Sequence, residues 1–265
     1  REARALDAEL AALATRARGY AEAMDFRFLY DRERGLFSIG WRVDDGALDE
    51  SHYDLLASEA RLASFLAIAK GEVPPRHWFR LGRPTAWRQR EPVLLAWSGS
   101  MFEYLMPDLV LEAPPESALG RTVSAAVAEQ IEYGAAHAVP WGISESAFNA
   151  RDRDFNYQYK NFGVPRLGLK RGLGDELVVA PYATALASMV APRAAAENLA
   201  ALARAGGRGR FGFCEAIDYT RERVPRDDGH AVVEAYMAHH QGMSIIAFAN
   251  VVLDCVFRRR FHAEP

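Results

Sequence analysis

Apolar side chains recur at helical spacing along most of the chain, and this pattern constrains the fold more than any other feature of the sequence. In the first segment, Leu6, Leu10 and Leu13 lie on one stripe that Tyr20 continues. Spacing and stop signals predict helices over residues 1–24, 51–71, 99–112, 117–137, 181–190, 192–205 and 229–253. Residues 26–43 are expected to form a short β-hairpin. Because strands and helices do not alternate, the predicted fold class is mostly α.

Charge balance and apolar content exclude several classes of protein. The 265 residues include 32 Lys and Arg against 35 Asp and Glu, a net charge of −3, so no nucleic-acid partner is expected. No apolar run reaches the roughly 18 residues that span a membrane. Two cysteines, Cys214 and Cys255, do not suggest a disulfide framework and favour a reducing compartment. Because the sequence does not begin with Met, we expect a soluble segment of a longer chain.

Glu59 is the first candidate for a catalytic group. In the predicted helix over residues 51–71 it lies on the same apolar stripe as Leu55, Leu62 and Leu66. A carboxyl group there is unfavourable unless it is paired or lines a cavity, and burial would raise its pKa and suit it to general-acid catalysis. The alternative is a structural salt bridge to an Arg from another helix.

Glu145 is the second candidate, within a Pro- and Gly-shaped turn that also holds Trp141. The turn belongs to residues 138–175, a long segment without helical period, and such loops are usually functional. An aromatic ring can stack on the C–H face of a sugar while a carboxylate contacts its hydroxyls or its anomeric carbon. The turn is expected to open a short helix, so Glu145 could instead be a carboxylate stabilised by the helix dipole.

Further polar and aromatic side chains gather at expected junctions between loops and helices, where they would line a polar cleft. Glu215 and Asp218 are expected to bracket one helical turn. Adjacent His239 and His240 would point about 100° apart on a helix and could not hold one metal together, so neither a metal nor a cofactor is predicted. The candidate substrate-binding residues are Trp97, Glu103, Tyr104, Trp141, Asn149, Arg151, Tyr157, Tyr159, Glu215, Asp218, His239, His240 and Gln241.

Longer motifs resemble the glucoamylase-like domain of cyclic β-1,2-glucan synthases. The resemblance runs from about Phe28 to Pro265, and its matching stretches include Tyr53 to Leu62, Trp97 to Pro107, Val139 to Asn149, Glu215 to Thr220 and Tyr236 to Met243. It implies that residues 1–265 form a single catalytic domain with an (α/α)6 toroid. A full toroid needs about twelve helices, more than this length readily holds, so either some helices are short or part of the ring lies outside this segment.

The resemblance also implies a reaction and a setting. Glu145 resembles the nucleophile and Glu59 the acid/base of a retaining transferase that closes linear β-1,2-glucan into rings by transglycosylation. The parent would lie at the cytoplasmic side of a bacterial inner membrane, with a glycosyltransferase module and a phosphorylase-like module. The alternatives are an endo-β-1,2-glucanase-type hydrolase and a non-catalytic glycan-binding module.

Overall fold

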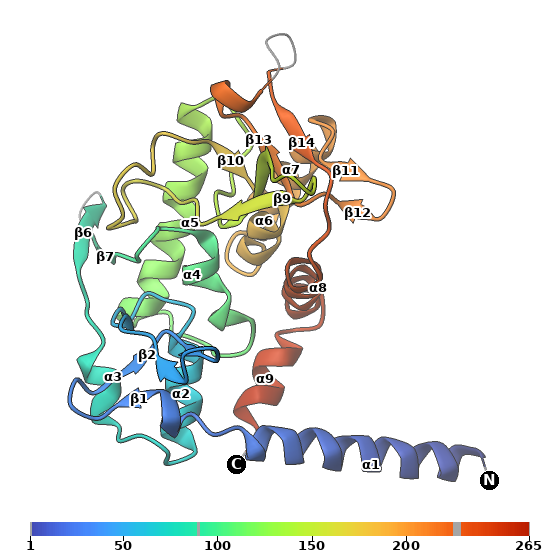
Figure 1. Ribbon diagram of the computed structural model, residues 1–265. Coiled ribbons are helices and arrows are strands. Elements are labelled where there is room, and N and C mark those ends of the chain that lie inside the picture. Colours follow the sequence, from blue (N-terminus) through green and yellow to red (C-terminus); the bar gives the residue numbers. More distant parts are fainter. Residues whose placement is uncertain (1, 89–90, 225–228, 265) are drawn as a thin grey trace. The chain divides into compact units, whose positions relative to one another are not determined.

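The computed structural model describes residues 2–88, 91–224 and 229–264, which belong to two compact units. Unit 1 comprises Arg1–Asp54 and Ala63–Leu81, and unit 2 comprises Leu55–Leu62 and Gly82–Pro265. The structure is mostly helical with several small sheets, as Figure 1 shows. This confirms the mostly α class. A closed ring of helices is not seen in the part of the chain that the structure describes.

Unit 1 contains the long helix α1 and a small sheet whose strands β1, β2 and β5 lie in that order. The sheet confirms the predicted hairpin, with Tyr30 opposite Phe37. His77 is fully buried beside it and bonds the Gly35 carbonyl and the Ser64 hydroxyl, both at 2.9 Å. The elements of this unit are α1 (Glu2–Ala23), η1 (Arg27–Leu29), β1 (Tyr30–Asp31), β2 (Leu36–Ser38), β3 (Trp41–Arg42), β4 (Ala47–Leu48), β5 (His52–Tyr53) and α3 (Arg76–Arg80).

Helix α2 (Arg61–Ala69) replaces the longer helix predicted over residues 51–71, and that prediction was wrong in its first half. The backbone of His52 and Tyr53 pairs with β2 instead, and turns follow up to the start of α2. Ser58 lies in these turns, and its hydroxyl accepts a hydrogen bond from the Ala60 amide at 3.2 Å just before the helix begins. Glu59 therefore lies in the turn before the helix and not on a helical stripe.

Helices of unit 2 agree with three of the predicted segments. The predictions over residues 117–137, 181–190 and 192–205 are confirmed as α5, α6 and α7, and α6 packs against α4, α7 and α8. The prediction over residues 99–112 was too long, because α4 gives way to a 3-10 turn at Pro107. The helical elements are α4 (Met101–Leu105), η2 (Pro107–Leu109), α5 (Ala118–Ala136), α6 (Pro181–Ala187), α7 (Pro192–Arg204), η3 (Arg221–Arg223), α8 (Ala238–Val252) and α9 (Val256–His262).

Strands are more frequent in unit 2 than the sequence suggested. The segment 138–175 holds a bulged hairpin, and the helix predicted from residue 229 begins only at Ala238, because Ala231–Val233 pairs with another strand. The segment of Glu215 and Asp218 is extended and not helical. The strands are β6 (Thr85–Arg88), β7 (Glu91–Leu94), β8 (Ser146–Arg151), β9 (Tyr157–Lys160), β10 (Val178–Val179), β11 (Arg208–Gly209), β12 (Gly212–Phe213), β13 (Ala216–Asp218) and β14 (Ala231–Val233).

The helices differ from membrane spans in length or in hydropathy. Over residues 2–88, 91–224 and 229–264, no single helix is long and apolar enough to cross a bilayer. Helices α8 and α9 reach the required length and composition only as a pair, which is bent by 93°.

Candidate functional site

Glu59 lies half-buried in the turn before α2, within unit 2. Burial raises the pKa of Glu59, and the charges of Glu103 and Glu145 raise it further. The hydroxyl of Ser58 donates to its Oε2 at 3.2 Å. No ion pair joins Glu59 to a cation among the described residues, so the structural salt bridge considered from the sequence is not formed. The pKa of Glu59 is raised, as expected for a buried carboxyl group, although a turn and not a helix positions it.

Glu145 immediately precedes β8, so the helix N-terminus expected there was wrong. The β8–β9 hairpin places Tyr159 opposite Ala147, and the Tyr159 hydroxyl donates to Oε1 of Glu145 at 2.7 Å. Burial raises the pKa of Glu145, while the Tyr159 hydrogen bond and the nearby His240 oppose that rise. Burial is the main cause of the raised pKa of both carboxyl groups, and the opposing partners are Tyr159 and His240 at Glu145 and the Ser58 hydroxyl at Glu59.

A buried His–Glu pair supports the segment that carries Glu145. Nδ1 of His240 contacts both carboxylate oxygens of Glu215 at 2.9 and 3.0 Å, and Glu215 also accepts the Ala147 amide at 3.3 Å. The Tyr182 ring stacks on the His240 ring at 3.7 Å, and its hydroxyl donates to the Glu145 carbonyl at 2.9 Å. Among the described residues, buried Nε2 of His240 has no hydrogen-bond partner.

Glu103, a predicted substrate contact, is instead held by its own helix start. Its carboxylate accepts the amide and hydroxyl of Ser98 and the amide and hydroxyl of Ser100, at 2.6–3.0 Å. Ser100 also caps α4, so Ser100 and Glu103 form a capping box. Four donors contact the Glu103 carboxylate, and its charge raises the pKa of both Glu59 and Glu145.

Tyr104 and Trp141 are also more buried than a substrate contact requires. The Tyr104 side chain is 1% exposed, and its hydroxyl lies 2.9 Å from the carbonyl oxygens of Leu94 and Leu167, to either of which it can donate. Trp141 is 7% exposed and packs so closely on Gly134 that an added Cβ there would lie 2.7 Å from the Trp141 Cβ. The structure therefore places both rings in the core of unit 2 and not on an open sugar-binding surface.

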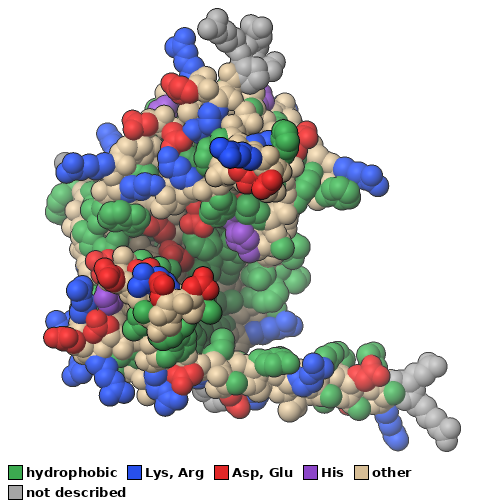
Figure 2. Space-filling view, viewed as in Figure 1, with side chains coloured by type: hydrophobic (Ala, Val, Ile, Leu, Met, Phe, Trp, Pro, Cys, Tyr) green, Lys and Arg blue, Asp and Glu red, His purple; other side chains and the backbone are tan. Residues whose placement is uncertain are grey.

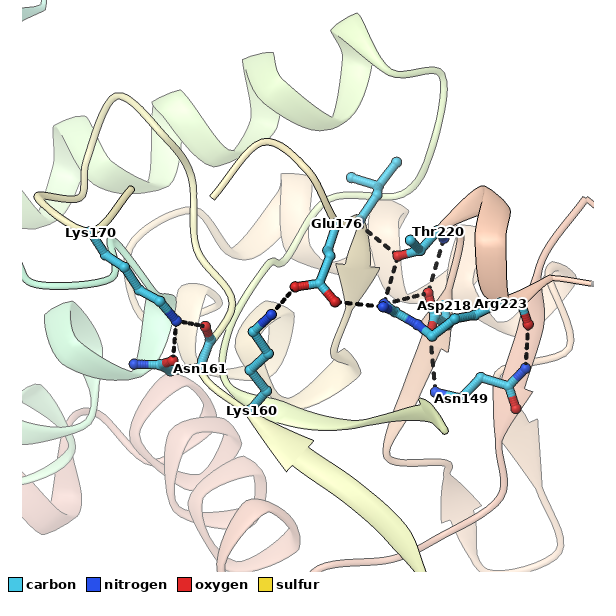
Figure 3. A network of polar contacts seen from close by, with 9 residues as sticks. Asn149, Lys160, Asn161, Lys170, Glu176, Asp218, Thr220 and Arg223 are labelled. Atoms are coloured by element: carbon cyan, nitrogen blue, oxygen red, sulfur yellow. Dashed lines mark hydrogen bonds and ion pairs between the residues drawn. The ribbon is translucent and has the colours of Figure 1, made fainter. Parts of the chain in front are cut away.

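Asp218 and Asn149 belong to a polar network that fixes β8 against β13 and the segment after it, as Figure 3 shows. Asp218 is fully buried, accepts the Asn149 amide at 3.0 Å and pairs with the Arg223 guanidinium at 2.7 Å. The Asn149 side chain donates to the Arg223 carbonyl at 2.6 Å. Glu176 joins Arg223 to Lys160 and extends the network. The Asp218 carboxylate and the Asn149 side-chain amide thus bond to other parts of the protein.

Other predicted contacts lie nearer the surface. Trp97 is 55% exposed, and His239 is exposed at the start of α8. Arg151 stacks on the Tyr157 ring and donates to its hydroxyl at 2.7 Å. The Gln241 amide donates to a main-chain oxygen of β12. Figure 2 shows acidic, basic and apolar side chains intermingled over the face that it displays.

Sequence reasoning missed several residues that build the site. The Ser100-x-x-Glu103 spacing is a capping-box signature and could have been recognised from the sequence. The roles of Arg61 and Tyr182 depend on contacts with residues distant in the sequence and carry no local signal, whereas Ser98 contacts Glu103 five residues further on. No group of three or more His, Cys, Asp or Glu side chains in the described part of the chain could hold a metal ion.

Comparison with known proteins identifies the class to which this fold and site belong. The model of the family described as “Putative glucoamylase” matches residues 51–265, and the chain belongs to this family. A curated relative, the cyclic β-(1,2)-glucan synthase NdvB of Rhizobium meliloti strain 1021, is 53% identical over 261 residues. The match covers 98% of this chain, and the chain spans only 9% of the length of that relative.

Solved structures show the same fold at low sequence identity. An endo-β-1,2-glucanase from Chitinophaga pinensis is 16% identical with a TM-score of 0.69, over 96% of this chain and 62% of that chain. A protein from Bacteroides fragilis with the same description as the family is 18% identical with a TM-score of 0.68, over 97% of this chain and 62% of that chain.

Proposed function

We propose that the chain is a retaining β-1,2-glucan glucanotransferase that closes linear chains into rings. The proposal rests on one observation above all: two half-buried carboxyl groups, Glu59 and Glu145, lie close enough for the charge of Glu145 to raise the pKa of Glu59. Such a pair can supply an acid and a nucleophile for glycosyl transfer. The identity to a cyclic β-(1,2)-glucan synthase supports the choice of substrate and outcome.

Glu145 is the proposed nucleophile. Its carboxylate attacks the anomeric carbon, and the bond from that carbon to the leaving oxygen breaks while Glu59 gives that oxygen its proton. The Tyr159 hydroxyl would hold the Glu145 carboxylate in the ionised form that attack requires. The glycosyl–enzyme ester then reacts with the terminal hydroxyl of the same glucan chain, and Glu59 takes the proton of that hydroxyl. Two displacements at one carbon retain the β configuration.

The other polar residues divide into two groups in this proposal. Exposed Trp97, half-exposed Tyr159 and His239 would contact the glucan directly, and the Arg151–Tyr157 pair would border it. The remaining predicted contacts would act through the residues that they hold in place, and these are Glu103, Tyr104, Trp141, Asn149, Glu215, Asp218, His240 and Gln241.

The setting of the domain is part of the proposal. Residues 1–265 would act as one catalytic domain within a longer (α/α)6 toroid, because the similar structures extend beyond the region that this chain matches. The parent would be a multidomain protein with glycosyltransferase and phosphorylase-like modules at the cytoplasmic side of the inner membrane. The small share of the curated relative that the chain covers supports a large parent.

Hydrolysis is the main alternative, and the structural similarity to an endo-β-1,2-glucanase favours it. The two reactions differ in whether a sugar hydroxyl or water accepts the glycosyl group. A glycan-binding module without catalysis is a further alternative that needs no matched acid and nucleophile.

Paired variants test the proposal. Purified wild type, Glu145→Gln and Glu59→Gln are incubated with linear β-1,2-glucan, and binding is measured separately by calorimetry. Glu197→Gln on the surface of α7 is the matched control, since its side chain is 69% exposed. We expect both site variants to bind glucan and to lose transfer, while the control keeps the wild-type rate. Ring formation by Glu145→Gln would contradict the assignment, and wild type that binds without reacting would favour the binding module.

A further inference from the structure

Arg61 is a buried cation that the proposed reaction does not use. It is 2% exposed, and its guanidinium makes contacts that join two separate segments. Nη1 donates to the carbonyls of Ser58 and Glu103 at 3.1 and 2.9 Å, and Nη2 donates to the Tyr104 carbonyl at 2.6 Å and to Oδ1 of Asp108 at 3.0 Å. Burial of a guanidinium group costs free energy unless its N–H groups are hydrogen-bonded. Here the acceptors lie where one planar guanidinium group can reach all of them.

These bonds fix the turn that carries Glu59. Ser58 is the residue directly before Glu59, and its carbonyl shares Nη1 with a carbonyl of α4. A second tether lies two residues earlier, where the Leu56 amide donates to the Gly82 carbonyl at 3.0 Å. The Glu59 backbone is therefore attached to α4, the helix that also holds the fixed charge of Glu103.

The distribution of charge is as important as the tether. Arg61 lies two residues from Glu59 in the sequence, yet its ion pair is with Asp108. The Glu103 carboxylate is occupied by Ser98 and Ser100 and takes no part in that pair. Burial raises the pKa of Asp108, and the charge and hydrogen bond of the adjacent Arg61 guanidinium oppose that rise.

We propose that Arg61 and Asp108 are a positioning pair for the acid/base: Arg61 fastens the Glu59 turn to α4, and Asp108 pairs with Arg61 and balances its charge. The inference rests on the proposed role of Glu59. Without Asp108, the uncompensated guanidinium would favour ionised Glu59, which cannot protonate a leaving oxygen.

Charged groups from several segments act on the carboxyl groups of Glu59 and Asp108. Glu59 faces Glu103 and Glu145, and its charge interacts with that of Arg61. Asp108 faces Arg61 and also interacts with Arg258 from α9 and with Glu112.

Asp108→Asn is the most direct test, because Asn keeps the Oδ1 acceptor for Arg61 and removes only the charge. We expect the basic limb of the kcat/KM profile for glucan transfer to move to lower pH by about one unit. Asp254→Asn is the matched control, because it neutralises an Asp whose side chain is 94% exposed, and its profile should match wild type. An Asp108→Asn profile identical to that of wild type would overturn the charge-balancing role.

An NMR titration gives a second reading that needs no catalysis. The chain is labelled with 13C at the carboxyl groups of Glu, and Glu59→Gln identifies the Glu59 signal. The Glu59 titration should move to lower pH in Asp108→Asn, and an unchanged titration would overturn the proposal. If wild type transfers no glucan, the proposed function fails, while the NMR titration still decides the role of the Arg61–Asp108 pair.

Arg61→Lys tests the tether, because an ammonium group cannot reproduce the fork of a guanidinium. We expect kcat to fall at least about tenfold with KM close to wild type, since the turn that carries the acid loses its fixed position. A variant with wild-type kcat and KM would overturn the positioning role.

Discussion

Glu103→Gln should destabilise the protein by an amount that follows from its four contacts. Oε2 of Glu103 accepts three donors and Oε1 accepts the Ser98 amide at 3.0 Å. The least damaging orientation of Gln places its NH2 group at the Oε1 position, where it faces the Ser98 amide, and an unsatisfied buried N–H costs about 1–3 kcal/mol. The other three bonds lose the benefit of a charged acceptor, about 1 kcal/mol each. Removal of a buried charge offsets part of this loss, so we expect a net loss of about 2–4 kcal/mol.

Urea unfolding followed by circular dichroism measures this loss directly. The midpoint should fall at constant m-value, because the surface exposed on unfolding does not change. Glu197→Gln on the exposed face of α7 should stay within about 0.5 kcal/mol of wild type. A Glu103→Gln protein that also stays within about 0.5 kcal/mol would show that the four contacts do not hold α4, and would refute the reasoning.

Further variants test the electrostatics and the surface of the site. Tyr159→Phe removes a hydrogen bond that lowers the pKa of Glu145, so the acidic limb of the kcat/KM profile should move to higher pH; an unchanged limb would contradict this contact. Because burial raises the pKa of Glu59, the native state loses stability as pH rises from the ordinary Glu range through that raised pKa. Glu59→Gln should therefore be more stable than wild type, and the difference in Tm should widen from pH 5 to pH 8; a constant difference would count against a raised pKa. Trp97→Ala should raise KM for glucan about tenfold with little change in Tm, because the ring is 55% exposed; an unaltered KM would remove Trp97 from the substrate surface.

The spacing of apolar residues was sufficient to predict the long helices. It gave wrong predictions where short strands take the place of the expected helix. Helices α5 and α7 repeat their apolar positions over several turns, and both were predicted closely. The two residues of β5 and the three of β14 are too few to show a period, and their partners lie elsewhere in the chain. The predicted helices therefore wrongly included residues 51–60 and the segment that begins at residue 229. In both places the backbone mostly forms strands or turns.

The surroundings of the two candidate glutamates differ from those predicted. Glu59 and Glu145 were singled out by an apolar stripe, a turn and a family resemblance, and in the structure the charge of Glu145 acts on Glu59. Their environments were predicted from helices that do not exist at either position. The actual environment of Glu145 comes from Tyr159 across a hairpin and from His240, a contact that spacing along the chain does not reveal.

The most direct test of the central claim is a mass spectrum of the products that the wild-type chain forms from linear β-1,2-glucan. Transfer of a glycosyl group to the terminal hydroxyl of its own chain adds no water to the product, so rings lighter than the corresponding linear chains by one water are predicted. Shortened linear chains without rings would contradict cyclisation and identify the chain as a hydrolase.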